Sequence, residues 1–253
     1  MNFELSEEQR MIQQSVERFV EDNYDLNSRV ALSSNSPGFS TENWHSMAEL
    51  GWLGLPFEEE DGGFGGNQID VLVVMEQFGR GLVLEPYLAS IIMGGGALKR
   101  GGTDALKSEI LPQVIEGTLQ LAFAYAEEQS RFDLDDVMTS ARKEGENFIL
   151  NGQKSMVQNA ETADKIVVSA RTSSGQVGPQ GITLFLIDAD AEGLSRDNFP
   201  TVDGLRASEI TLENVSVGPD RILGEVDQGF SILQSVANDA MLALSAEAVG
   251  AME

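Results

Sequence analysis

The fold is decided by residues 103–125, TDALKSEILPQVIEGTLQLAFAY, because the spacing of the apolar side chains changes within this stretch. Before Gly117, the residues Leu106, Ile110 and Val114 recur with the period of about 3.6 that marks one face of a helix. After Gly117, the run LQLAFAY follows the period of about 2 that is typical of strands. This change predicts a helical region that ends at Gly117 and a β region that begins directly after it.

Helical spacing fills the sequence before this stretch and returns after Gln228. A capping box of Ser6 and Gln9 predicts the start of the first helix. A later helix is expected to bury three apolar residues: Trp44, Met47 and Leu50. The predicted fold class is α+β. It has an N-terminal all-α domain over residues 1–117, a middle β domain over 118–226 and the first helix of a C-terminal α domain over 227–253.

Seven short strands are predicted in the β region, at residues 119–125, 137–142, 147–150, 153–157, 165–171, 182–187 and 209–215. The dipeptide Asn151-Gly152 predicts a two-residue hairpin between the third and the fourth of them. Strands of this length joined by short turns suggest a compact β-sandwich or barrel. The final helix has an apolar face without predicted partner helices, which suggests a C-terminally truncated chain or a partner that covers the face.

Composition narrows the classes of function. The chain carries 41 acidic and 16 basic residues, a formal net charge of -25, and should repel phosphate backbones and anionic lipid. It contains no cysteine, which excludes disulfides and thiolate metal sites. The polar N-terminus and the lack of an apolar run of about 20 residues predict neither a signal peptide nor membrane insertion. We expect a cytoplasmic protein that binds no nucleic acid.

No pattern predicts a stand-alone catalyst or a metal site. His45 is the only histidine, and a structural or surface position on its helix is favoured. The glycine-rich pieces GGFGG and MGGG lack the lysine of a P-loop. Two stretches remain, AYAEEQSRFDLDD at 124–136 and QKSMVQN at 153–159. Both lie at ends of predicted strands, where backbone and side chains can converge on a ligand.

Five segments, taken in order, resemble the acyl-CoA dehydrogenase family. They are LSEEQRMIQQSVERFVED, MAELGWLGLPFEEEDGGFGG, VVMEQFGRGL, GENFILNGQKSMVQNAETADKIVVSAR and GLRASEITLENVSVGPDRILGEVDQGF. The resemblance implies an N-terminal helical domain, a middle β domain and a C-terminal helical bundle of which this chain holds the opening helix. It also implies FAD as cofactor, an acyl-CoA substrate that is dehydrogenated at its α and β carbons, and electron-transfer flavoprotein as acceptor.

The site residues follow from the same resemblance. The family base is usually a glutamate of the C-terminal domain with no counterpart here, so no catalytic residue is assigned. Substrate contacts are expected from Phe132, Asn238 and Met241. The flavin would be bound by Phe123, Tyr125, Ala126, Arg131, Phe132, Met156 and Gln158.

Several of these positions depart from the family pattern. Ala126 stands where a threonine hydroxyl is usual, and Arg131-Phe132 replaces a Gly-Ser pair. Met156 and Gln158 stand where tryptophan and threonine are usual, and Met241 where an arginine is common. The Arg131 guanidinium could bind a flavin oxygen or pyrophosphate, a carboxylate of a partner chain, or simply Asp133 or Asp135.

The pattern Glu-x-Gln-Ser-Arg-Phe-Asp at 127–133, with AEAVGA at 246–251, resembles the small-subunit branch of the family, which includes pimeloyl-CoA dehydrogenase small subunits. In such pairs a related subunit completes the enzyme, so a heteromer is expected, with a homo-oligomer as the other possibility. Two further hypotheses stay open. One is a non-catalytic assembly subunit of a heteromeric acyl-CoA dehydrogenase, and the other is a flavin oxidase or monooxygenase on the same fold.

Overall fold

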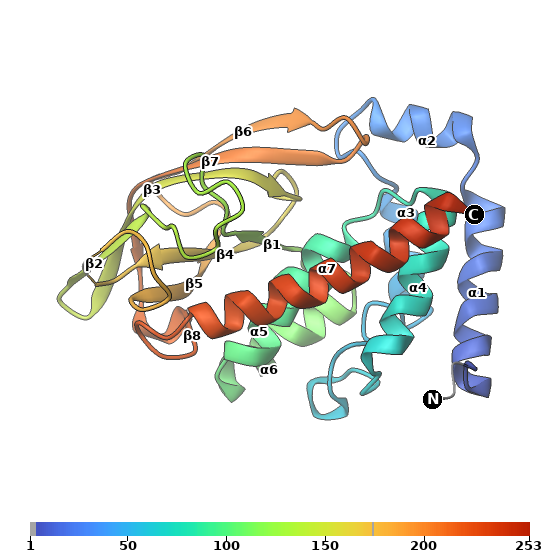
Figure 1. Cartoon of the computed structure of the whole chain (residues 1–253), viewed down its shortest axis with the longest axis horizontal. Coiled ribbons are helices and arrows are strands. Elements are labelled where there is room, and N and C mark those ends of the chain that lie inside the picture. Colours follow the sequence, from blue (N-terminus) through green and yellow to red (C-terminus); the bar gives the residue numbers. More distant parts are fainter. Residues whose placement is uncertain (1–3, 174) are drawn as a thin grey trace.

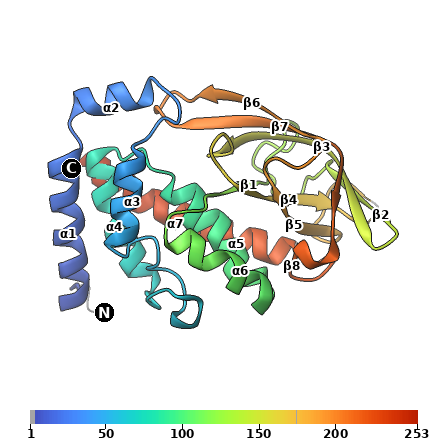
Figure 2. The same ribbon diagram turned by 180° about the vertical axis from the view of Figure 1, so that it is seen from behind.

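The computed structural model describes residues 4–173 and 175–253. It places a group of helices beside a β-sheet region, and one long C-terminal helix runs from the sheet along the helices (Figure 1; Figure 2 shows the same arrangement from behind). This arrangement confirms the predicted α+β fold class. Among the described residues, none of the helices combines the length and the hydrophobicity that a bilayer-spanning segment requires.

The helical part begins with the predicted capping box, in which the Ser6 hydroxyl accepts from Gln9 N and the Gln9 side chain accepts from Ser6 N. The helix α2 was not predicted from the sequence, because it buries no residue and so has no apolar face to read. The elements are α1 (Glu7–Asn23), α2 (Leu26–Ser33), α3 (Thr41–Glu49), η1 (Glu59–Asp61), α4 (Gln68–Gly81), η2 (Tyr87–Gly95), α5 (Gly96–Gly101) and α6 (Asp104–Ile115).

The prediction for α3 is correct for Trp44 and Met47, which are buried, and wrong for Leu50, which is 49% exposed. The reason is the turn that ends the helix. Gly51 takes a left-handed φ of 82°, and Trp52 N donates to Met47 O, so the chain reverses after Glu49. Trp52 then occupies the core in place of Leu50.

The β part is one eight-stranded sheet that folds over on itself. Figure 1 shows the layer of β3, β6 and β7 lying over the layer of β1, β4 and β5. Phe148 and Phe185 meet between the layers with ring centroids 5.3 Å apart. The strand order is β6-β7-β3-β2-β4-β5-β8, and β1 pairs in parallel with β4. The elements are β1 (Leu121–Ala124), β2 (Ser140–Glu144), β3 (Asn147–Gln158), β4 (Lys165–Arg171), β5 (Ile182–Asp188), β6 (Leu194–Pro200), β7 (Arg206–Val217), η3 (Pro219–Arg221) and β8 (Ile222–Leu223).

The hairpin predicted at Asn151-Gly152 is wrong, because β3 runs through both residues without a turn. The Asn151 side chain instead accepts from Asn214 N across to β7 at 2.9 Å. A Cβ on Gly152 would lie 2.5 Å from Thr139 Oγ1, so glycine is needed here for a close approach and a β-bulge. The actual turn follows Glu144, where Gly145 has a φ of 63°.

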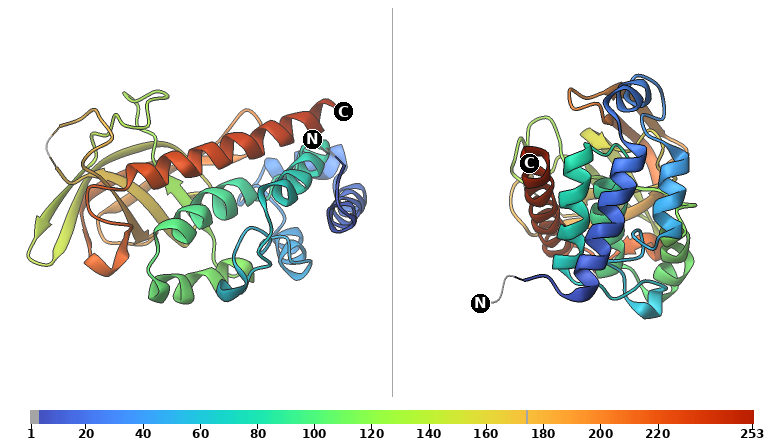
Figure 3. Two further views of the ribbon diagram at one scale, coloured as in Figure 1. Left: turned by 60° about the horizontal axis from the view of Figure 1, so that its bottom comes forward. Right: turned by 90° about the vertical axis from the view of Figure 1, so that its right-hand side faces the viewer.

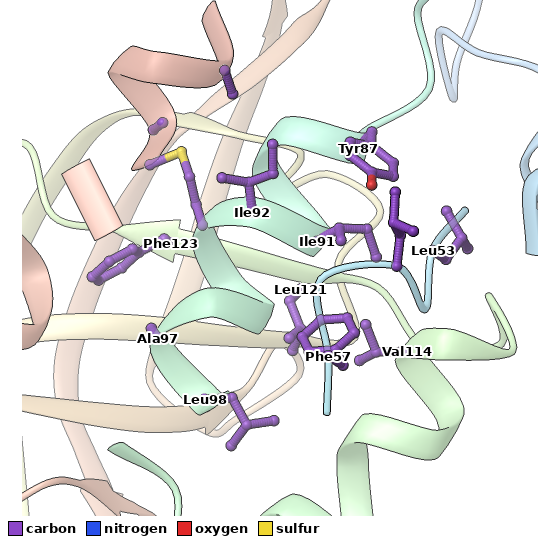
Figure 4. Packing of buried hydrophobic residues seen from close by; sticks show 14 of the residues in the cluster. Leu53, Phe57, Tyr87, Ile91, Ile92, Ala97, Leu98, Val114, Leu121 and Phe123 are labelled. Atoms are coloured by element: carbon purple, nitrogen blue, oxygen red, sulfur yellow. The ribbon is translucent and has the colours of Figure 1, made fainter. Parts of the chain in front are cut away.

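The strand β1 separates two hydrophobic cores. Leu121 and Phe123 face the core shared with the helices, and Ala122 and Ala124 face the core inside the sheet. This alternation follows from the two-residue repeat of a strand. Figure 4 shows Leu121 and Phe123 beside the packed side chains of η2. The predicted change of spacing after Gly117 therefore marks the point at which the chain leaves the helical core and enters β1, the strand that separates the two cores.

The C-terminal helix α7 (Phe230–Met252) packs along α4, α5 and η2, so the expectation that it has no partner helices is wrong (Figure 3). Glycines permit the closest approach. A Cβ built on Gly79 of α4 would lie 1.9 Å from Glu247 O, and one on Gly250 of α7 would lie 1.8 Å from Glu76 O. The two backbones therefore touch, and any side chain at the crossing would separate them.

We expect Gly79→Ala to lower the free energy of unfolding by about 1 to 3 kcal/mol, although alanine is the better helix former. The clash is with backbone atoms of α7, which cannot rotate away. Urea unfolding of the variant measures this loss. The control is Ala248→Ser at an exposed position of α7, the other helix of the crossing, which should stay within about 0.5 kcal/mol. Equal stability of the two variants would contradict the close crossing.

Candidate functional site

A buried ion pair lies where β1 ends. Lys154 of β3 donates from Nζ to Glu127 Oε1 at 2.7 Å and to Ser169 Oγ at 3.0 Å, and its side chain is fully buried. The Glu127 carboxylate also accepts from the backbone N–H groups of Met138 at 2.8 Å and Thr139 at 3.1 Å. One carboxylate thus connects β3 with both ends of the loop that follows β1.

Both members of this pair are charged at neutral pH. Burial lowers the pKa of Lys154 to about 8, against the opposing charge of Glu127. Burial also raises the pKa of Glu127, but the charge of Lys154 and its hydrogen bond outweigh burial and hold that pKa below its usual value. Because each charge is satisfied by the other and by hydrogen bonds, removal of one partner would leave an uncompensated buried charge.

The two strand-end stretches predicted to form a ligand site lie side by side. Ser155 N donates to Ala126 O at 2.9 Å, directly beside the ion pair of Glu127 and Lys154. Met156, the next residue of β3, is exposed. The structure therefore brings together Ala126 after β1 and Ser155 near the end of β3, which are 29 positions apart in the sequence.

The loop after β1 presents Arg131 and Phe132 to solvent. Arg131 has a left-handed φ of 51°, and the side chain of Phe132 is 97% exposed. Among the described residues Arg131 forms no ion pair, so the alternative that it simply pairs with Asp133 or Asp135 is wrong. The backbone near Asp135 is instead held by Arg171, whose Nη2 donates to Asp135 O at 2.8 Å.

A cavity of about 130 Å³ lies between α4, η2, α7 and the end of β3. Phe39, Phe78 and Leu244 contribute apolar wall, and Gln158 lies on the side of the sheet. The cavity also contains Glu85, which is 5% exposed. A largely apolar cavity with a few polar groups is the usual form of a small-molecule site.

The remaining predicted residues are placed apart from this cavity. Phe123 is buried and Tyr125 half-buried, with their rings 5.7 Å apart. Asn238 and Met241 are exposed on α7 and do not line the cavity, whereas Leu244, one turn later, does. Whether these residues bind flavin or substrate stays a prediction.

Sequence reasoning missed the partnership of Glu127 with Lys154 and the burial of Glu85. A signal existed for Lys154, which shares the inward phase of Phe148 and Leu150 along β3. The hairpin wrongly predicted at Asn151-Gly152 placed Lys154 on a separate strand, so this shared alternation was not recognised. Glu85 stands alone within the apolar run VLEPYL, and an acid in such a run indicates either a break in structure or a buried carboxyl.

Comparisons with known proteins cover nearly the whole chain. Residues 6–118 match the family described as "Acyl-CoA dehydrogenase, N-terminal domain", and residues 122–215 match "Acyl-CoA dehydrogenase, middle domain". The chain is 29% identical over 255 residues to the probable acyl-CoA dehydrogenase YngJ of Bacillus subtilis (strain 168), covering 99% of this chain and 67% of that protein.

Two further similarities extend the comparison. The chain is 30% identical over 252 residues to the caffeyl-CoA reductase-Etf complex subunit CarC of Acetobacterium woodii, covering 97% of this chain and 66% of that protein. The solved FAD complex of PigA superposes with a TM-score of 0.90 at 26% identity, covering 100% of this chain and 67% of that chain. The chain thus spans about two thirds of the length of these proteins.

Proposed function

This chain belongs to the acyl-CoA dehydrogenase family, and from that premise we propose that it is an FAD-dependent subunit that dehydrogenates an acyl-CoA thioester. The observation that carries the proposal is the junction of the two strand-end stretches. The resemblance assigns both of them to the flavin, and Ser155 N and Ala126 O join them at 2.9 Å.

The residues at this junction fit a flavin in part. Met156 and Phe132 offer exposed apolar surface to a ring, and Arg131 has a guanidinium that is not engaged by an acid of the described residues. The planar guanidinium can donate paired hydrogen bonds to a flavin oxygen or to a pyrophosphate. Ala126 offers only backbone groups, because it lacks a hydroxyl. The fit supports a flavin held mainly by backbone groups and by Arg131.

The residues of this chain would bind and orient the reactants. FAD, when bound, supplies the acceptor for the hydride that leaves the acyl chain. The ion pair of Glu127 and Lys154 fixes the loop after β1, so that Arg131 is presented from a held backbone. The apolar cavity that includes Gln158 offers space for an acyl chain. The base for the α proton is not assigned to this chain.

We propose that a related subunit completes the enzyme, as in the small-subunit branch that residues 127–133 and 246–251 resemble. The relative CarC is named as a subunit of a complex with Etf, and this supports electron-transfer flavoprotein as the acceptor here. Because the chain spans about two thirds of its relatives, the activity is proposed for the assembled protein.

The test is to purify the chain together with its partner subunit and to measure bound flavin and acyl-CoA-dependent dye reduction. The proposal expects both. An assembled complex that contains no flavin and reduces no dye with any acyl-CoA would contradict it.

A second candidate, a non-catalytic assembly subunit, is favoured by the missing hydroxyl at Ala126 and the exposed bulk of Phe132. Flavin stoichiometry separates the two candidates. One flavin per heterodimer, placed in the partner, favours assembly alone, and one flavin per chain rejects it.

We expect Arg131→Ala to lower the retained FAD about tenfold, because one charge-assisted hydrogen bond is lost. The free energy of unfolding should change by less than about 0.5 kcal/mol, since Arg131 is exposed and pairs with no acid of the described residues. Flavin absorbance after gel filtration and urea unfolding measure the two effects.

Arg142→Ala, at an exposed arginine of β2, is the matched control and should retain FAD fully. Arg131→Lys keeps the charge but lacks the planar guanidinium, so the FAD that it retains should lie between the amounts retained by Arg131→Ala and Arg142→Ala. If Arg131→Ala keeps its FAD but loses the partner subunit, the arginine contacts the partner and not the flavin.

A further inference from the structure

The guanidinium of Arg171, at the end of β4, is buried and donates to four backbone carbonyls. Arg171 is 7% exposed. Its Nη1 donates to Gly178 O at 2.9 Å and also to Gln180 O. Its Nη2 donates to Asp135 O at 2.8 Å and also to Gln176 O. Because all four acceptors are main-chain oxygens, these contacts fix the path of the backbone itself.

Two loops meet at this guanidinium. Asp135 belongs to the loop after β1, and the three other carbonyls belong to the loop before β5, residues 175–181. The loops also exchange backbone hydrogen bonds, from Val137 N to Gln176 O at 3.0 Å and from Gly178 N to Asp135 O at 3.1 Å. Two of the four carbonyls thus accept from an amide of the other loop as well, and the guanidinium lies where the loops join.

This arrangement requires a cation with several donors. Carbonyl oxygens carry partial negative charge, so four that face one point repel one another unless a positive group lies between them. Burial lowers the pKa of Arg171, but an arginine side chain stays protonated in proteins. The charges of Asp135, Asp136 and Glu127 oppose this lowering. A lysine would serve less well, because its three donors lie at a single point, whereas a guanidinium has five in one plane.

The loop after β1 carries Arg131 between its anchors. Glu127 already connects both ends of this loop. Asp135, which Arg171 holds, lies four residues after Arg131 and gives the loop a further anchor away from Glu127. Arg131 has a left-handed φ of 51°, a conformation that a residue other than glycine keeps only where the surrounding structure fixes it. The position of the Arg131 guanidinium therefore depends on Arg171.

We propose that Arg171 is a positioning residue for FAD, which holds the loop after β1 so that the guanidinium of Arg131 meets the cofactor. The proposal rests on the proposed function, in which Arg131 donates to a flavin oxygen or to the pyrophosphate. Without Arg171, the four carbonyls would move apart and Arg131 would sample many positions. Its hydrogen bond to FAD would then have to offset a larger loss of conformational entropy, and affinity would fall although Arg131 itself is present.

The experiment is a double-mutant cycle on FAD affinity, in which the protein assembled with its partner subunit is stripped of flavin and titrated with FAD. Arg171→Met removes the guanidinium and keeps most of the apolar stem. We expect it to weaken FAD binding about tenfold in the unmodified background and less than about twofold in the Arg131→Ala background. A residue that acts through Arg131 loses its effect once Arg131 is gone, whereas general damage to the fold weakens FAD binding in both backgrounds.

The matched control is Arg221→Met, which should bind FAD as the unmodified protein does. Arg221 pairs with Glu109 and lines a cavity together with Lys165, at the opposite end of β4 from Arg171. If Arg171→Met does not fold, Arg171→Lys takes its place in the same cycle, because it keeps the charge but cannot reach all four carbonyls. Equal weakening in both backgrounds, or none in the unmodified background, would overturn the proposal.

If the assembled protein binds no FAD, the proposed function fails, and amide hydrogen exchange without flavin decides the inference. Asp133 N donates to Ser130 O at 2.8 Å, across the turn that contains Arg131. Arg171→Met should speed the exchange of this amide by at least about fivefold and leave exchange in α6 unchanged. If the Asp133 amide exchanges at the same rate in both proteins, Arg171 does not position Arg131, and the proposal is overturned.

Discussion

Lys154→Met should lower the free energy of unfolding by about 3 to 5 kcal/mol, the usual cost of removing one partner from a buried ion pair. Glu127 would keep its charge inside the protein, with only the hydrogen bonds from Gln129, Met138 and Thr139 to stabilise it. Methionine fills a similar volume, so the loss reports the charge and not a cavity. Urea unfolding measures the loss, and faster amide exchange at Met138 and Thr139 should accompany it.

Two further variants identify the cause. Glu127→Gln combined with Lys154→Met should recover most of the loss, because both buried charges are gone and the glutamine oxygen still accepts from the loop. Arg142→Met breaks the exposed pair with Glu144 and should cost less than about 0.5 kcal/mol. If Lys154→Met is no more costly than Arg142→Met, the buried pair does not hold the loop.

Glu85→Gln should gain stability relative to the unmodified protein as the pH rises. The pKa of Glu85 is about 7 in the folded chain against an ordinary value of 4.5, so the unfolded chain releases this proton first. The contribution of Glu85 to stability is complete below pH 4.5 and is lost as the pH rises through 7. The stability difference between the two proteins should therefore change by about 2 to 3 kcal/mol between about pH 5 and pH 8.

Chemical unfolding at several pH values gives this difference directly. Any constant cost of the buried amide cancels, because it is the same at each pH. The other acids of the cavity, Glu247, Asp203 and Glu161, and the base Arg206 are present in both proteins. A difference that stays constant across the range would show that Glu85 does not titrate in the folded state near neutral pH.

The sequence predicted those parts of the fold that depend on local spacing. The Ser6 cap, the burial of Trp44 and Met47, and β4 with its bounds were all readable, because each is determined by neighbouring residues. The hairpin at Asn151-Gly152 failed because the glycine is required by Thr139, a residue that reaches β3 only in the folded sheet. Long-range contact overrode a strong local turn signal.

The candidate site was predictable in location and much less so in chemistry. Strand ends pointed to the stretches that Ser155 and Ala126 bring together. The pairing of Glu127 with Lys154 and the unsatisfied oxygen of Glu85 depend on which groups meet in the folded chain, which residues far apart in a sequence do not show. The flavin was inferred from resemblance to a family, whereas the acids around the cavity were identified from the structure.

The crossing of α4 and α7 has a consequence for synthesis of the chain. The helices up to α6 leave the ribosome more than a hundred residues before α7, yet Leu233, Val236 and Ala240 of α7 belong to their core. The surface of α4 around Gly79 therefore stays uncovered while the whole sheet is being made. We expect the helices of the nascent chain to remain loosely packed, and their exposed apolar surface to need a chaperone, until α7 emerges and completes the core.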